Sequence, residues 1–291
     1  MVIASVACVL VWGAGQCEAT VQPLKATVTL DRTAYALGEP ITLTVTITNN
    51  SNAPVQALNL SKYGLGFLLE CDIWRPCFWT QQGPPVGYSS GVAEPLVGGS
   101  DLLGVLAPGR VTSSSSGITA MYQFSSGNFA ATMGDMSKVF FPSGSKFNPL
   151  LLSNTAFFRV FATAEERDRA VKAGLPELAV EIALGERKVV SSQAPVNTRQ
   201  GVFAPLMEAC QLLEAKVQTR DKTITVTRAD RKLTIDTTTG KFTLRIGRRA
   251  TKGETDLVTA GNKLMVSFRW LAESLGEKNA KLVWRVVEKK G

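Results

Sequence analysis

The chain has 291 residues, of which 45% are hydrophobic and 19% are charged, a composition typical of a globular protein with room for two domains. It contains no histidine, which excludes Ser-His-Asp and Cys-His catalytic groups and most zinc sites. No apolar run reaches the roughly 18 residues that a membrane-spanning helix needs, so we expect no transmembrane segment.

The formal net charge is +8, and it is unevenly distributed. Residues 20–195 carry 13 basic and 13 acidic side chains, whereas residues 196–291 carry 19 basic and 10 acidic ones. The surplus of +9 therefore lies in the last third of the chain. Such asymmetry favours an anionic partner: acidic polysaccharide, phosphate-bearing cell-wall polymer, lipid headgroups or nucleic acid. The alternative is a soluble basic surface without a specific partner.

Residues 1–19 have the pattern of an export signal. Val2–Trp12 is an apolar core, and Cys17-Glu18-Ala19 fits a cleavage site with small residues at its first and third positions. Cleavage there would give a mature start at Thr20. The basic segment that usually opens such a signal is missing, because no Lys or Arg precedes Lys25. The alternative is a buried first strand or helix; the signal reading predicts an extracytoplasmic protein, secreted or associated with the cell envelope.

Two cysteines beyond this segment flank a short loop. Cys71 and Cys77 are a candidate disulfide in an oxidising compartment, although their spacing permits the bond without requiring it. Cys210 lies in an apolar helical stretch, and we interpret it as a small buried core residue rather than a nucleophile.

The N-terminal half is predicted to be mainly β. Residues 41–48 alternate between apolar side chains and threonine, which indicates a strand with one buried face. Further strands are expected at 27–33 and 55–60, and a helix at 163–173. Residues 80–155 are rich in Gly, Ser and Pro; extra strands, an insertion and mobile loops all remain alternatives for them.

The opening of this half resembles bacterial immunoglobulin-like domains, in which a Tyr and a Gly-Glu-Pro turn precede an alternating strand. Tyr35, Gly38-Glu39-Pro40 and residues 41–48 carry the resemblance. The intracellular proteinase inhibitor-like group shares the same opening. The resemblance implies a β-sandwich over residues 20–195, with residues 80–155 as a long insertion. It also implies a late strand at 157–162 and makes 180–184 the candidate closing strand.

Residues 196–291 have a different pattern. An amphipathic helix is expected at 204–213, followed by three alternating strands at 223–227, 232–236 and 241–246. A second helix at 266–276 and a final strand at 282–287 complete the chain. In the strand at 241–246, Lys241, Thr243 and Arg245 share one face.

This layout resembles the copper amine oxidase N-terminal domain-like ("stalk") family, whose hallmark is a doubled V-P-L-R-x-h-A-E-x-L-G helix, each copy followed by a V-x-W strand. Val266–Gly276 matches closely, with Ser267 in place of proline, and Trp284 occupies the strand tryptophan. The first copy, Ala204–Ala215, keeps Pro205 but departs at several positions. The resemblance implies an antiparallel sheet packed on helices, so we expect a mainly β chain with an α+β second domain. It implies no copper chemistry, because the oxidase active site belongs to another domain; we expect no metal site and no cofactor.

These observations predict a non-catalytic binding or scaffolding protein. Its densest basic cluster comprises Arg245, Arg248, Arg249 and Lys252, our first choice for contact with an anionic cell-wall polymer or polysaccharide. The alternative is a solvated strand edge that blocks edge-to-edge pairing. The sandwich loops are expected to serve a protein partner, and nucleic acid is not expected.

Three further interpretations stay open. The aromatic group Trp74, Phe78 and Trp79 is either a sugar-stacking surface or, as is more common, part of the core. A secreted protease inhibitor is the alternative function that the proteinase inhibitor-like opening indicates. An enzyme of unknown class would need a carboxylate cluster or a Ser/Lys site, which the spacing of these residues does not indicate.

Overall fold

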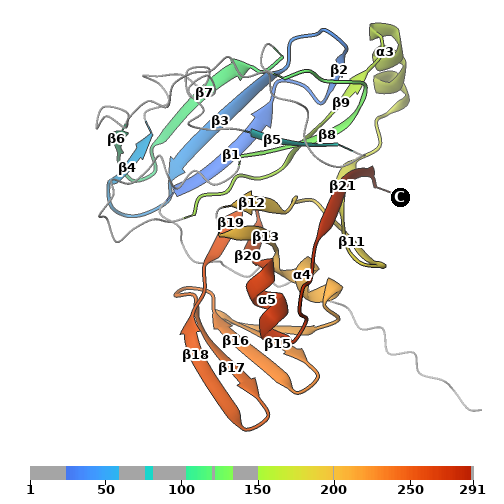
Figure 1. Ribbon diagram of the computed structural model, residues 1–291. Coiled ribbons are helices and arrows are strands. Elements are labelled where there is room, and N and C mark those ends of the chain that lie inside the picture. The colour runs from blue at the N-terminus through green and yellow to red at the C-terminus, as the bar shows by residue number, and fades with distance from the viewer. Residues whose placement is uncertain are drawn as a thin grey trace, which may run out of the picture.

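The computed structural model describes residues 24–58, 76–80, 103–119, 122–133, 150–198 and 200–289. Over these ranges the chain is mainly β, with short helices, which confirms the predicted fold class. Figure 1 shows two β-rich parts, one built from β1–β9 and α3 and the other from β10–β21, α4 and α5. None of the described helices is long and apolar enough to cross a membrane.

The N-terminal part consists of two sheets that share one core. One sheet has the strand order β1-β3-β7 and the other β2-β9-β8-β5, while β4 and β6 form a separate ribbon. The bounds are β1 (Leu24–Leu30), β2 (Ala34–Ala36), β3 (Thr42–Asn49), β4 (Val55–Leu58), β5 (Pro76–Thr80), β6 (Leu103–Leu106), β7 (Val111–Gly117), β8 (Gly127–Met133) and β9 (Ala156–Phe161).

Strand β3 shows why this sandwich forms. Leu43, Val45 and Ile47 are fully buried, and they pack with Phe129 and Phe158 from the opposite sheet. The intervening threonines face outward, because successive strand side chains point to opposite sides. The predicted alternation is therefore confirmed. The immunoglobulin-like assignment of this part stays a prediction.

The serine-rich run in the predicted insertion is a strand. Residues 113–116 belong to β7, which pairs along its whole length with β3, and the hydroxyls of Thr44 and Ser115 lie 2.7 Å apart. Serine has little intrinsic preference for strands, so the β conformation here follows from pairing with β3. Of the alternatives for residues 80–155, extra strands are thus correct for β6, β7 and β8.

The helix α3 (Ala164–Ala173) has the predicted boundaries. Thr163 caps it by accepting a hydrogen bond from the backbone N–H of Glu166 at 3.2 Å, and Gly174 ends it. The spacing of Thr163 and Glu166 was the sequence signal for this start, and the structure confirms it.

The C-terminal part contains three sheets and two helices. The sheets have the orders β11-β10-β21, β12-β13-β20-β19 and β14-β15-β16-β17-β18. The bounds are β10 (Leu178–Leu184), β11 (Arg187–Ser191), β12 (Val196–Thr198), β13 (Gly201–Pro205), α4 (Leu206–Leu212), β14 (Lys216–Arg220), β15 (Thr223–Arg228), β16 (Arg231–Asp236), β17 (Lys241–Ile246), β18 (Arg249–Glu254), β19 (Leu257–Ala260), β20 (Lys263–Ser267), α5 (Phe268–Ser274) and β21 (Val283–Glu288).

One expected strand lies in a different sheet. Residues 180–184 were expected to close the sandwich, but β10 pairs with β11 and β21. Its apolar side chains Val180 and Ile182 pack into the core around α4 and α5 rather than into the sandwich core. The prediction was wrong because a resemblance in sequence pattern locates a strand without identifying the strands with which it pairs.

Polar side chains join the two parts. The side-chain amide of Asn154 exchanges hydrogen bonds with the backbone of Val28, at 2.8 and 3.0 Å, and Gln193 accepts one from the N–H of Thr155 at 3.1 Å. Arg159, which is 7% exposed, donates to the carbonyl of Pro176 at 2.7 Å and to Glu288 at 3.2 Å. The segment around 154–159 thus connects the sandwich to the C-terminal part.

Several predictions fall outside the described side chains. The export signal, Cys71 and Trp74 lie outside the described residues. Cys77, Phe78 and Trp79 belong to β5, for which only the backbone pairing with β8 is described. The disulfide and the role of the aromatic group therefore stay predictions.

Candidate functional site

The five-stranded sheet β14–β18 has one apolar and one polar face. Ile224, Val226, Leu233 and Ile235 are buried against the helices of the C-terminal core. The residues between them point the opposite way, to solvent, because side chains alternate along each strand. This outward face is the most strongly charged surface that the register of any described sheet produces.

The antiparallel register orders the outward face into three rows that run across the strands. We call their residues together the basic sheet face. The middle row is Gln218, Thr225, Thr234, Thr243 and Lys252. One flanking row is Arg220, Thr223, Asp236, Lys241 and Glu254, and the other is Lys216, Thr227, Lys232, Arg245 and Ala250.

Positive charge dominates this face. It carries six cations and two carboxylates, and all six cations are exposed: Lys216, Arg220, Lys232, Lys241, Arg245 and Lys252. Within the described ranges none of the six forms an ion pair, whereas Arg228 nearby is paired with Glu277 at 2.6 Å. These cations are therefore free to meet an anionic ligand.

One of the two carboxylates is already engaged. Asp236 accepts hydrogen bonds from the backbone N–H groups of Thr238 and Thr239, at 2.8 and 2.9 Å. These hydrogen bonds, that of Thr239 first, lower the pKa of the Asp236 carboxyl below its usual value. Asp236 thus stabilises the turn between β16 and β17.

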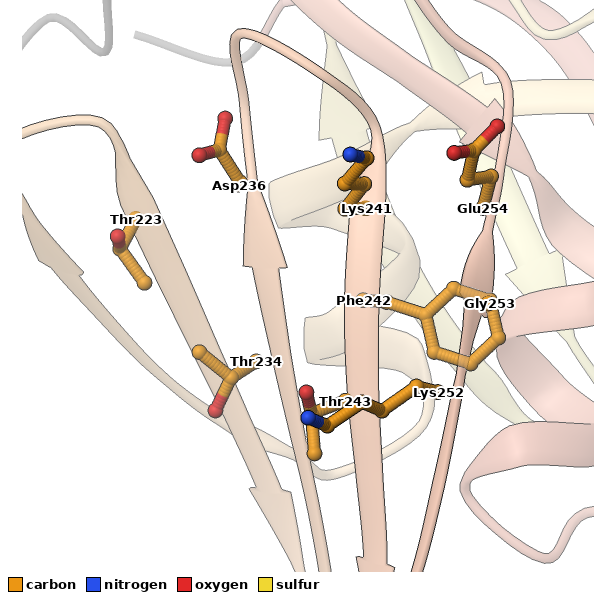
Figure 2. Close-up of a pocket in the computed structure, with 9 residues that line it drawn as sticks. All are labelled: Thr223, Thr234, Asp236, Lys241, Phe242, Thr243, Lys252, Gly253 and Glu254. Carbon is orange, nitrogen blue, oxygen red and sulfur yellow. The ribbon is translucent and has the colours of Figure 1, made fainter.

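Figure 2 shows the hollow on this face, with Lys241 and Glu254 toward one end and Thr243 and Lys252 toward the other. Its volume is about 510 Å³. Phe242 lies beneath, on the opposite side of β17, and its ring passes across Gly253, where a Cβ atom would come within 2.8 Å of the ring. The missing side chain at Gly253 thus leaves room for the Phe242 ring on the side of the sheet opposite the hollow.

The structure separates the predicted basic cluster. Arg245 and Lys252 lie on the basic sheet face, and Arg248 lies in the turn between β17 and β18. Arg249 pairs with Ile246 and so belongs to the opposite side of the sheet. The cluster was continuous in sequence, but a hairpin distributes its members over two faces and a turn.

Three cations of this face were missed by sequence reasoning: Lys216, Arg220 and Lys232. Lys241 was predicted to share a face with Arg245 but was not included in the basic cluster. The signal was present in part, because Lys232 and Lys241 occupy the same alternating positions as the outward threonines. The edge-protection alternative suits Lys252 on the edge strand β18. It does not explain Lys232, Lys241 and Arg245, which lie on the interior strands β16 and β17.

A second polar cluster lies inside the C-terminal core. The Glu208 Oε1 atom accepts hydrogen bonds from the hydroxyl of Ser191 and from the Lys263 Nζ atom, both at 2.9 Å. Cys210 is fully buried, and burial together with the charge of Glu208 raises the pKa of its thiol to about 12. The interpretation of Cys210 as a core residue is confirmed. Ser191 and Glu208 are both buried, and together with Lys263 they link β11, α4 and β20, so the cluster has the character of a structural link.

Among the described residues there is no group of three or more potential metal ligands.

Comparison with known proteins identifies part of the chain. The family "Copper amine oxidase N-terminal domain" matches residues 183–281, a range that begins within β10. A comparison with curated proteins gave no match. Among solved structures, Spo0M, a sporulation control protein from Bacillus subtilis, aligns with 92% of this chain and 91% of its own at 10% identity and a TM-score of 0.26, too low to infer a shared fold. The doubled helix pattern and the family match agree, so residues 183–281 are similar to the copper amine oxidase N-terminal domain, the part of those enzymes that lies outside the catalytic domain.

Proposed function

We propose that this protein is an exported, non-catalytic binding and scaffolding protein that holds an anionic polymer of the cell envelope on its basic sheet face. The observation that carries the proposal is the set of six exposed cations on one sheet face, without ion pairs among the described residues. Three of them lie on interior strands, where they have no role in protecting a sheet edge.

The energetics favour a polymer over a small anion. An exposed ion pair contributes about 0.2–1 kcal/mol, so six contacts contribute roughly 1–6 kcal/mol together. A small anion contacts only one or two of these cations, so its binding would be weak. A chain that meets all six gains from high effective concentration, because each contact after the first is intramolecular.

The test compares two triple variants with the same net charge. The first removes the interior cations of the face (Lys232→Gln, Lys241→Gln, Arg245→Gln). The matched control removes three exposed cations elsewhere (Arg169→Gln, Lys172→Gln, Lys278→Gln). The measurement is co-sedimentation of the full chain with purified cell wall at low and high salt.

We expect the face variant to lose most of its binding and the control to retain it, with wild-type binding falling as salt rises. Equal losses in both variants would mean that net charge alone is responsible. Undiminished binding of the face variant would refute the proposal.

The export part of the proposal has its own test. N-terminal analysis of the protein from the extracytoplasmic fraction should show a chain that begins at Thr20. Recovery of the whole chain from the cytosol with residues 1–19 uncut would contradict it.

A further inference from the structure

We propose that the basic sheet face binds a linear acidic polysaccharide, whose chain crosses the strands along the row of Thr225, Thr234 and Thr243. This inference rests on the proposed function and deepens it, because it names the chemical class of the polymer and the direction in which it lies.

The register provides the track. Thr225 is opposite Thr234, and Thr234 is opposite Thr243, so the three hydroxyl-bearing side chains lie side by side on neighbouring strands, about 4.8 Å apart. Lys252 stands at the end of this row on β18. Five strands give the row a length of roughly 19 Å, which suits an extended chain rather than a single small molecule.

Cations border the track on both sides. Along β17, Lys241 and Arg245 are two residues before and two residues after Thr243, so their backbone positions are roughly 14 Å apart with the threonine midway. Lys232 on β16 lies beside Arg245 on the same border. A chain over the threonines would therefore meet Lys232 and Arg245 along one edge. Along the other edge it would meet Lys241, which stands between the carboxylates of Asp236 and Glu254.

The middle row distinguishes a polysaccharide from other polyanions. A threonine hydroxyl both donates and accepts hydrogen bonds, which matches the hydroxyls of a sugar chain, while the bordering cations match its carboxylates. Single-stranded nucleic acid is usually held on aromatic side chains that stack with the bases. Phe242 is among the residues that line the hollow, but its ring packs edge-on against Trp270 at 5.1 Å, so the face offers no row of aromatic rings for stacking.

The hollow follows the same line. Its lining includes Thr234, Thr243 and Lys252 from the middle row and, from one border, Lys241 with the carboxylates of Asp236 and Glu254 (Figure 2). Threonine and lysine thus face one recess, so a single sugar chain in it would reach both.

The sandwich provides a matched control surface. Thr46 on β3 lies opposite both Thr27 on β1 and Ser113 on β7, which makes another outward row of hydroxyls across strands. In that sheet the outward positions of β3 are all threonine, and no pair of cations borders the row as Lys241 and Arg245 do.

The experiment replaces hydroxyls with methyl groups. The test variant is Thr225→Val, Thr234→Val, Thr243→Val, and the control is Thr27→Val, Thr46→Val, Thr48→Val. Valine is favoured in strands and has nearly the same shape, so both variants should fold, which thermal melting checks. Binding of the full chain is measured with polygalacturonate, a linear carboxylated polysaccharide, and with inorganic polyphosphate, an anion without sugar hydroxyls.

We expect the test variant to bind polygalacturonate at least about tenfold more weakly, as the loss of three hydrogen bonds of ordinary net strength implies, and polyphosphate with unchanged affinity. The control should match wild type with both. An unchanged polygalacturonate affinity, or an equal loss with both polymers, would overturn the inference while leaving the proposed function standing. Failure of the wild-type chain to bind either polymer would overturn both.

Discussion

Replacing Gly240 with alanine tests whether the turn between β16 and β17 has room for a side chain. Gly240 has a φ of +69°, and a Cβ atom there would lie 2.3 Å from the carbonyl oxygen of Thr255. The same two residues are joined by a hydrogen bond from the Thr255 N–H to the Gly240 carbonyl at 2.9 Å. The backbone segments at Gly240 and Thr255 cannot move apart without breaking this hydrogen bond.

The cost has two parts. A left-handed backbone at alanine costs about 1–2 kcal/mol, and forcing a methyl group into occupied space adds about 1–3 kcal/mol. We therefore expect Gly240→Ala to lower the free energy of unfolding by about 2–5 kcal/mol. Gly247, in the next turn, has a φ of +56° but nothing within 4 Å of its would-be Cβ. Gly247→Ala should therefore show only the backbone cost, about 1–2 kcal/mol.

Urea unfolding of the two purified variants measures this difference directly, with equal slopes required for a valid comparison. The reasoning predicts a clearly lower midpoint for Gly240→Ala than for Gly247→Ala. If the two midpoints coincide, contact with Thr255 does not limit the turn, and the argument from close approach is refuted.

Three further predictions concern buried and titrating groups. Cys210 should resist alkylation at pH 8 in the native protein and react in urea, as peptide mapping would show, because its thiol is buried and its pKa is raised to about 12; labelling in the native state would contradict this. Asp236→Asn should destabilise the protein at neutral pH. The difference in stability from wild type should shrink as pH falls below 3.8, because a carboxyl whose folded pKa is lowered loses its stabilising effect when it is protonated. A difference in melting temperature that stays constant with pH would contradict this explanation. Arg159→Met should lower the free energy of unfolding in urea by about 2–3 kcal/mol, because its charged hydrogen bonds to Pro176 and Glu288 are lost. The exposed control Arg169→Met should lower it by less than about 0.5 kcal/mol. Similar values for the two variants would contradict a stabilising link between Arg159 and the C-terminal part.

The sequence predicted elements with strong local signals. Strand β3 alternates perfectly, and α3 has both a capping residue and a terminal glycine, so each was recognised with nearly correct bounds. The helices α4 and α5 carry apolar residues at helical spacing. For β3, α4 and α5 the period of burial is visible in a single segment, whereas α3 has no buried residue and was recognised from its cap and terminal glycine.

Weak local signals explain what was missed. Strands β14 and β18 are edge strands with few buried side chains, so they show little apolar alternation. Lys216 and Arg220 could not be assigned to the face without β14, and Arg249 could not be placed on the opposite side without β18. Register between strands depends on contacts far apart in sequence, which one strand does not reveal.

The pairing of β10 with β21 has a practical consequence. Because Leu178 is opposite Glu288, the chain enters and leaves the C-terminal part at one place, beside the sandwich, while the hairpin β17–β18 extends away from it (Figure 1). A tag or surface anchor joined after Lys289 would hold the molecule by its sandwich side. Immobilised in this way, the protein would leave the hairpin β17–β18, whose strands carry Lys241, Arg245 and Lys252, at the end away from the point of attachment.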